Sequence, residues 1–170
     1  MKICFLTQEF PPETMRGGIG NQMYIVSKEL AKKHDVYVIT EALNKDKFYV
    51  ENGLKIYRIK PKIPSIPLIN KFFGDLTHKF FYNLQVYRKL KSLNVDFDIV
   101  QAPEFSFEGL LPSFNKNINL VTRLATPVFI DEKFNHGRLS FQYKIISFLE
   151  KLQTKRSQGL ISQTKFLSNI

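Results

Sequence analysis

A glycine-rich loop is the feature of this sequence with the clearest chemical meaning. It reads Gly17-Gly18-Ile19-Gly20 and stands just before a stretch with helical periodicity. Glycines let backbone N–H groups approach an anion closely, and the N-terminus of a helix adds a positive partial charge. The loop therefore predicts a phosphate or diphosphate site with Gly17, Gly18 and Gly20 as the binding residues.

Two other interpretations of this loop stay open. A dinucleotide fingerprint would carry a third glycine or alanine where Met23 stands, and it would follow its strand at once rather than about ten residues later. Glu41 nevertheless stands at the end of an apolar run, where an acid that binds ribose could stand. An NAD-type oxidoreductase domain is therefore one alternative. The other is that the glycines only turn the chain into a helix.

The elements that would position this loop alternate between strands and helices. Short apolar runs, typical of strands buried on both faces, occur at residues 3–6, 36–40, 98–101, 119–124 and 159–162. Apolar positions recur at helical spacing over residues 21–33, 69–90 and 139–153. This alternation predicts an α/β fold that is Rossmann-like, with a mainly parallel open sheet and helices on both faces.

Two segments depart from this pattern. Residues 48–50 and 54–59 flank Glu51-Asn52-Gly53, which indicates a hairpin. The run 54–59 alternates apolar and basic residues, so we expect a half-exposed strand. Gly74 lies inside the long helical pattern over residues 69–90 and counts against an unbroken helix there.

Ligands of open α/β sheets bind beyond the carboxyl ends of the strands. Three predicted loops lie at that edge, namely residues 8–20, 102–108 and 125–137. His136 lies in the last of them, near Asp131 and Glu132, and is a candidate for the cleft. Of the other two histidines, His34 follows a helix C-terminus, and we expect His78 to be solvated on the polar side of the long helix.

The sequence resembles the N-terminal domain of retaining glycosyltransferases of family 4. The motifs that carry the resemblance are Lys2-Ile3-Cys4-Phe5-Leu6-Thr7, Phe10-Pro11-Pro12, Gly17-Gly18-Ile19-Gly20 and Leu30-Ala31-Lys32-Lys33-His34-Asp35-Val36. Later motifs are Ala102-Pro103-Glu104-Phe105, Thr122-Arg123-Leu124-Ala125-Thr126-Pro127 and Gly159-Leu160-Ile161-Ser162-Gln163-Thr164. Lys33 stands where the family usually has glycine, and Ala125 where many relatives have histidine.

The resemblance implies a two-domain GT-B enzyme whose nucleotide-sugar donor is a substrate held mainly by a C-terminal domain. Transfer would retain the anomeric configuration without a bound metal or other cofactor. Gly17 and Gly18 would face the donor diphosphate. Glu104, Arg123 and Thr126 would line the acceptor side of the cleft, and we add His136 to this set.

The resemblance also sets the domain organisation that we expect. Residues 1–162 would form the N-terminal, Rossmann-like, acceptor-side domain, and residues 163–170 a stub that leads to a missing donor domain. The donor-site residues would lie in that missing domain, so the fragment alone would be inactive. A non-catalytic accessory half of a GT-B fold is the remaining alternative.

Positive charge is concentrated in residues 55–91. Nine lysines or arginines against Asp75 give this stretch +8 of the net +10, and apolar and aromatic residues are interleaved with them. Such a stretch can lie on anionic lipid, which would place the enzyme on the inner face of a membrane near a lipid-linked or surface glycan acceptor. In the alternative, the aromatic residues pack on the sheet and the lysines face water.

The composition of the chain indicates the cellular compartment and the kinds of partner that we expect. The single cysteine, Cys4, cannot form an internal disulfide, and its place in an apolar run predicts a buried, inert thiol. The first residues lack the long apolar run of a signal peptide, so we expect a cytoplasmic protein. No nucleic-acid-binding module is recognisable, and we therefore expect no nucleic acid as a partner.

Overall fold

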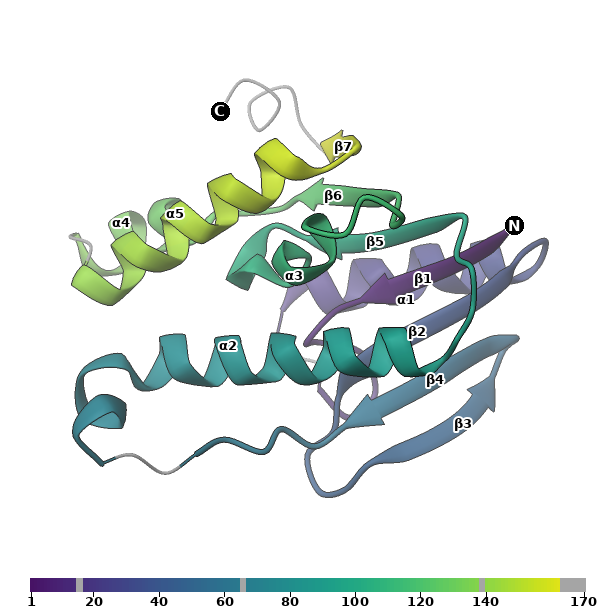
Figure 1. The fold of residues 1–170 in the computed structure, drawn as a ribbon, viewed down its shortest axis with the longest axis horizontal. Helices are drawn as coiled ribbons and strands as arrows, with labels where there is room; N and C mark the ends of the chain where they lie inside the picture. Colours follow the sequence, from purple (N-terminus) through teal and green to yellow (C-terminus); the bar gives the residue numbers. More distant parts are fainter. Residues whose placement is uncertain (15–16, 65–66, 138–139, 163–170) are drawn as a thin grey trace.

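The computed structural model describes residues 1–14, 17–64, 67–137 and 140–162, and in it seven strands form one sheet (Figure 1). The strands are β1 (Lys2–Leu6), β2 (Asp35–Glu41), β3 (Lys47–Glu51), β4 (Leu54–Ile59), β5 (Ile99–Pro103), β6 (Leu120–Leu124) and β7 (Gly159–Ser162). Their order is β3-β4-β2-β1-β5-β6-β7, and every pair is parallel except the β3–β4 hairpin. The strand order reverses between β1 and β5, which is where open α/β sheets bind ligands.

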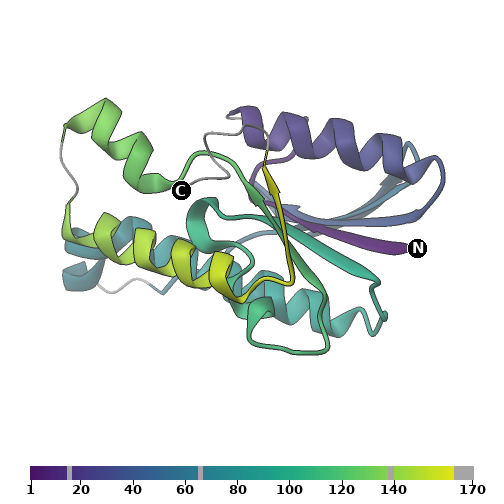
Figure 2. The same ribbon diagram turned by 90° about the horizontal axis from the view of Figure 1, so that it is seen from above.

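Helices cover both faces of the sheet. They are α1 (Gly18–Ala31), α2 (Pro67–Ser92), η1 (Phe105–Phe107), α3 (Leu110–Ser113), α4 (Val128–His136) and α5 (Phe141–Arg156). Figure 2 shows α1 on one face and α2 with α5 on the other. The fold class predicted from the alternation of strands and helices is therefore confirmed. No helix in the described ranges is long and apolar enough to cross a membrane.

The core lies in two layers because side chains alternate along each strand. Phe5 of β1 packs with Met23 of α1, whereas Leu6 packs with Tyr82 of α2 on the opposite face. Cys4 belongs to the second layer and is fully buried, and burial raises the pKa of its thiol far above the ordinary value. The prediction that Cys4 is buried is confirmed.

Two helical segments differ in detail from the sequence pattern. Helix α2 is interrupted at Phe73, whose φ of −135° and ψ of 26° are not helical, next to the glycine that predicted a break. The predicted loop 125–137 contains α4, which starts after Pro127 and is fixed by tertiary bonds that a local pattern cannot reveal. Leu139, where we expected the last helix to begin, lies outside the described residues, and α5 begins at Phe141.

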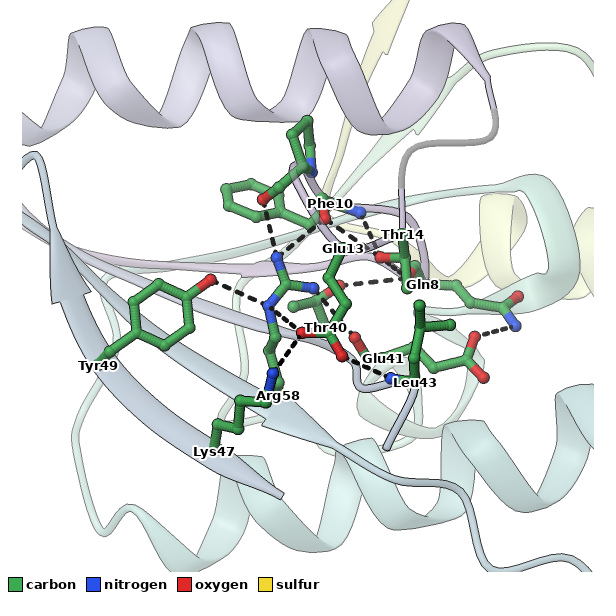
Figure 3. A network of polar contacts seen from close by, with 11 residues as sticks. Gln8, Phe10, Glu13, Thr14, Thr40, Glu41, Leu43, Lys47, Tyr49 and Arg58 are labelled. Atoms are coloured by element: carbon green, nitrogen blue, oxygen red, sulfur yellow. Dashed lines mark hydrogen bonds and ion pairs between the residues drawn. The ribbon is translucent and has the colours of Figure 1, made fainter. Parts of the chain in front are cut away.

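Arg58 of β4 is buried, and the expectation of a half-exposed strand is wrong at this residue. Its side chain turns inward under the loop that follows β1 and is 1% exposed (Figure 3). Its guanidinium donates hydrogen bonds to Tyr49 Oη (2.9 Å) and to the carbonyl oxygens of Glu41 (3.1 Å), Phe10 (3.0 Å) and Pro11 (2.8 Å). A buried charge is tolerated when its donors are satisfied in this way.

Glu13 completes the network from the loop side. Its carboxylate lies 3.5 Å from Arg58 Nε and accepts hydrogen bonds from Lys47 Nζ (2.9 Å) and Leu43 N (2.8 Å). The charges of Arg58 and Lys47 and these bonds hold the pKa of Glu13 below its ordinary value, against the effect of burial. The contacts of Arg58 and Glu13 thus join the β3–β4 hairpin to the loop from residue 8 to residue 14.

We expect Arg58→Met to lower the free energy of unfolding by about 3 kcal/mol or more. The variant leaves three carbonyl oxygens and a tyrosine hydroxyl without their donor, and it removes a charge beside Glu13. Arg88→Met, at an exposed position of α2, is the matched control and should change stability by less than about 0.5 kcal/mol. Urea unfolding of both variants measures this, and equal losses would contradict the structural role of Arg58.

Candidate functional site

A polar cleft of about 430 Å³ lies at the carboxyl ends of β1, β2 and β5. It is lined by Gln8, Glu9, Thr14, Glu41, Asp75, His78, Lys79 and Phe105. The first three follow β1, Glu41 ends β2, Phe105 follows β5, and the other three come from α2. The cleft therefore stands at the point where the strand order reverses.

Glu41 is the centre of the polar contacts in this cleft. Its Oε2 accepts a hydrogen bond of 2.8 Å from Gln8 Nε2, and its Oε1 lies 3.7 Å from His78 Nε2. On the α2 side, Lys79 Nζ is 2.8 Å from Asp75 Oδ1. His78 was expected to be solvated, and this expectation is wrong, because its side chain is half-buried and faces Glu41 across the cleft.

Glu108 lies beneath the cleft and connects two of its walls. It is 5% exposed, and its Oε2 accepts a hydrogen bond of 2.9 Å from Gln8 N. Burial raises the pKa of this carboxyl well above its ordinary value, and the negative charges of Glu9 and Glu41 raise it further. The lining of the cleft itself holds three acidic residues, Glu9, Glu41 and Asp75, beside Lys79, although the chain carries a net charge of +10.

The glycines of the predicted diphosphate site have different surroundings. A Cβ at Gly20 would lie 2.7 Å from the carbonyl oxygen of Glu9, so this glycine permits a close approach of helix and loop. A Cβ at Gly17 would lie 3.2 Å from Glu9 Oε2, whereas Gly18 has open space around it. The first turn of α1 carries no acidic residue, and its N-cap residue, Gly17, has no side chain to cap it, although the Glu9 carboxylate lies beside Gly17.

Of the residues predicted for the acceptor side, Glu104, Arg123 and Thr126 are not among the described residues that line the polar cleft. Glu104 is 2% exposed, and its Oε2 accepts a 2.6 Å hydrogen bond from Ala125 N, which joins the loops after β5 and β6. Burial raises its pKa to about 6. Arg123 is buried in β6, and burial lowers the pKa of its guanidinium. Thr126 is exposed, and His136 ends α4 with a side chain outside the described part.

Glu104 instead faces a second hollow of about 370 Å³ beside α5. Its other walls include Leu124, Pro127, Phe129 and Leu160, and they are mainly apolar. Glu104 is therefore brought close to the predicted loop 125–137 but not to the glycines.

Sequence reasoning missed the contribution of α2 to the site. Asp75, His78 and Lys79 stand at i, i+3 and i+4, a spacing that places them on one face of a helix. This spacing was a signal, but only the fold shows that the face borders a cleft. No group of three or more His, Cys, Asp or Glu side chains suited to a metal ion occurs in the described ranges.

Glu150 of α5 holds the two loops on the far side of the cleft. It is 2% exposed, and its two oxygens accept hydrogen bonds from Ser106 N (2.9 Å) and Val128 N (3.0 Å). Burial raises its pKa to about 8, the charge of Glu104 adds to this effect, and Lys79 opposes it. The folded protein therefore favours the protonated carboxyl at neutral pH.

We expect the stability of the fold to decrease as the pH rises from about 5 to about 8. The unfolded chain releases the Glu150 proton near pH 4.5, whereas the folded chain keeps it to about pH 8. The stabilising effect is complete below the first value and is lost as pH approaches the second. Glu150→Gln cannot titrate and should flatten the dependence, whereas Glu29→Gln, at an exposed site on α1, should not. Urea unfolding at several pH values between about 5 and about 8 measures the free energy of unfolding of each variant. If Glu150→Gln leaves the dependence of this free energy on pH unchanged, the raised pKa of Glu150 is wrong.

Comparison with known proteins shows which family the sequence matches and which solved structures share its fold. The family model described as Glycosyltransferase Family 4 matches residues 16–170, whereas no curated protein matches the sequence. The catalytic domain of starch synthase IV from Arabidopsis thaliana, bound to ADP and acarbose, matches with a TM-score of 0.52 and 14% identity over 72% of this chain and 33% of its own. Sucrose-phosphate synthase from Thermosynechococcus elongatus matches with a TM-score of 0.54 and 11% identity over 94% and 41%.

The chain thus spans about a third to two fifths of the length of these enzymes. At these identities the likeness concerns the fold, which is the Rossmann-like fold of GT-B glycosyltransferases. The family model covers most of the sequence, including the glycine loop, β2 and β5, whereas β1 and the cleft residues that follow it lie before the matched range. The chain belongs to glycosyltransferase family 4.

Proposed function

We propose that this chain is the acceptor-side half of a retaining glycosyltransferase that transfers a sugar from a nucleotide-sugar to a glycan or lipid-linked acceptor. The observation that carries the proposal is the polar cleft at the switch point of the sheet, in a chain of this family. Residues 1–162 would form this half, and a donor-binding domain beyond them would complete the enzyme. Residues 1–170 alone would then bind substrate without turnover.

The cleft has the chemistry that an uncharged sugar requires. Sugar hydroxyls are hydrogen-bond donors and acceptors, and the carboxylates of Glu41 and Asp75 can accept from them while Lys79 and Gln8 donate. The acidic residues of the lining outnumber Lys79 and disfavour an acceptor that carries phosphate or carboxylate at this position. We infer that the part of the acceptor bound here is neutral or carries an amino group.

The donor diphosphate would bind at the start of α1. The first turn of this helix, which carries no acidic residue, and the open space at Gly18 support the proposal. Gly20 contributes by letting the helix approach Glu9 rather than by direct contact. Glu104 and Arg123 would act by shaping the loops after β5 and β6, with Thr126 and His136 nearer the acceptor.

The charge distribution of residues 55–91 supports a second proposal, peripheral contact with the cytoplasmic face of a membrane. Lys60 and Lys62 are exposed in the proline-rich connection, and Phe72 (60% exposed) and Phe80 (44% exposed) stand out from α2. Exposed basic and aromatic side chains together favour an anionic lipid surface. Arg58 takes no part in this surface, because it is buried.

We expect Glu41→Gln to weaken the binding of methyl pyranosides to the chain by about tenfold. The variant keeps an oxygen that Gln8 can bond, but it replaces a charge-assisted hydrogen bond to the sugar by a neutral one. Glu51→Gln, at the end of β3, is the control and should leave binding unchanged. Titration by ligand-detected NMR with a panel of neutral methyl pyranosides measures both. If the two variants bind the pyranosides with equal affinity, the cleft is not the site that binds the acceptor sugar.

We expect the chain to sediment with vesicles of anionic phospholipid at low salt and not with neutral vesicles. Lys60→Glu with Lys62→Glu should reduce the bound fraction by about tenfold or more, since each basic residue contributes about 1 kcal/mol near such a surface. Lys32→Glu with Lys33→Glu makes the same charge change in the turn just after α1 and should have a smaller effect. Equal losses would show a general charge attraction, and no sedimentation at low salt would end this proposal.

A further inference from the structure

The turn after β5 has a strained backbone. Ser106 has a φ of 61° and a ψ of 20°, and Phe107 has a φ of 48°, so two successive residues with side chains lie in the left-handed region. Such a conformation costs about 1–3 kcal/mol for each residue, and it persists only where the surroundings impose it. It is uncommon for any residue but glycine and still more so for a bulky one.

Buried side chains of two helices impose this conformation. Asn83 of α2 donates through Nδ2 to the carbonyl oxygens of Ser106 (3.0 Å) and Phe107 (3.3 Å). Glu150 of α5 accepts from Ser106 N (2.9 Å), as described above. Asn83 and Glu150 are each 2% exposed, so these bonds are shielded from water. The turn is held on both its N–H and its carbonyl sides.

The strained turn places one aromatic ring in the polar cleft. Phe105, the first residue of the turn, is the aromatic member among the residues that line the cleft. Lys79 Nζ lies 5.9 Å from the centre of its ring, which places the ring next to the Asp75–Lys79 pair. Phe107, two residues later, is 1% exposed and packs in the core with Leu110. Phe105 packs against the same core cluster from the side of the cleft and stays partly exposed, whereas Phe107 is enclosed in it.

We propose that this turn fixes Phe105 as a flat wall against which the acceptor sugar ring packs, with Asn83 and Glu150 as positioning residues. The inference rests on the proposed function of the cleft and names the part of the acceptor that it recognises. An aromatic face carries negative partial charge and attracts the C–H groups on the apolar face of a pyranose. The hydroxyls at the ring edge then reach Glu41 and Asp75. The cleft selects a rigid ring with an apolar face and not a flexible polyol.

The experiment compares methyl pyranosides with sorbitol, which offers hydroxyls but no rigid ring. Phe105→Leu should weaken the binding of the pyranosides about fivefold and leave the weaker binding of sorbitol unchanged, whereas Phe105→Tyr should keep both. Phe114→Leu, at an exposed ring on the border of α3, is the matched control and should have no effect. In the wild type, intermolecular NOEs should join the Phe105 ring protons to the pyranose C–H protons.

The positioning role has its own readout. Glu150→Leu should weaken pyranoside binding and abolish these NOEs, and Glu150→Gln, which keeps an acceptor for Ser106 N, should restore both in part. In the Phe105→Leu background, Glu150→Leu should add no further loss of affinity, because a positioning residue acts only through the group that it holds. Ser106→Gly, which suits a positive φ, should raise stability and preserve binding.

The outcomes separate this inference from the proposed function. If pyranosides bind and Glu41→Gln weakens them while Phe105→Leu does not, the aromatic wall is wrong and the acceptor cleft stands. Additive losses in the double variant Phe105→Leu, Glu150→Leu would overturn the positioning role. If neither pyranosides nor sorbitol bind to the wild-type chain at millimolar concentration, the proposed function fails and this inference fails with it.

Discussion

The guanidinium of Arg58 is the interaction on which the first wall of the cleft depends. It is a buried positive charge whose hydrogen bonds end on backbone carbonyl oxygens of two different segments, the loop after β1 and the end of β2. Without a donor at this point, those carbonyls would be buried and unpaired, a state that costs more than an ordinary lost hydrogen bond. Gln8 and Glu41 therefore keep their positions because a residue far from the cleft in sequence satisfies the backbone behind them.

The second wall is built on the same principle, with a carboxyl and an amide side chain in place of a guanidinium. Glu150 and Gln153 project from α5 and bond backbone groups of the loops after β5 and β6, including Gly109 N (2.8 Å) and the carbonyl oxygen of Pro103 (2.9 Å). Loops at the carboxyl edge of a sheet have few ladder bonds of their own. Buried polar side chains from neighbouring elements supply hydrogen bonds in place of those ladder bonds and hold the loops in position.

The sequence was sufficient for those parts of the structure that follow from local pattern. Continuous apolar runs indicate strands buried on both faces, and Gly74 marks the interruption of α2 at Phe73. It was not sufficient for Arg58, because the alternation of basic and apolar residues in β4 is the same whether the basic side chain faces water or a buried set of carbonyls. The glycine loop drew attention to one end of the cleft, and His78 was misplaced because helical spacing does not show which neighbour a face meets.

The opposite signs of the net charge and of the cleft are compatible because they act over different distances. The exposed lysines determine attraction to a surface, and beyond about 10 Å their field is largely screened at 0.1 M salt. Within the cleft, Lys79 is already paired with Asp75, and two further acidic residues, Glu9 and Glu41, belong to the same lining. A chain with a charge of +10 can therefore approach an anionic membrane with one face and still favour an uncharged sugar in its cleft. Net charge is evidence about the surface that a protein meets, and the nearest few side chains are evidence about the molecule that it binds.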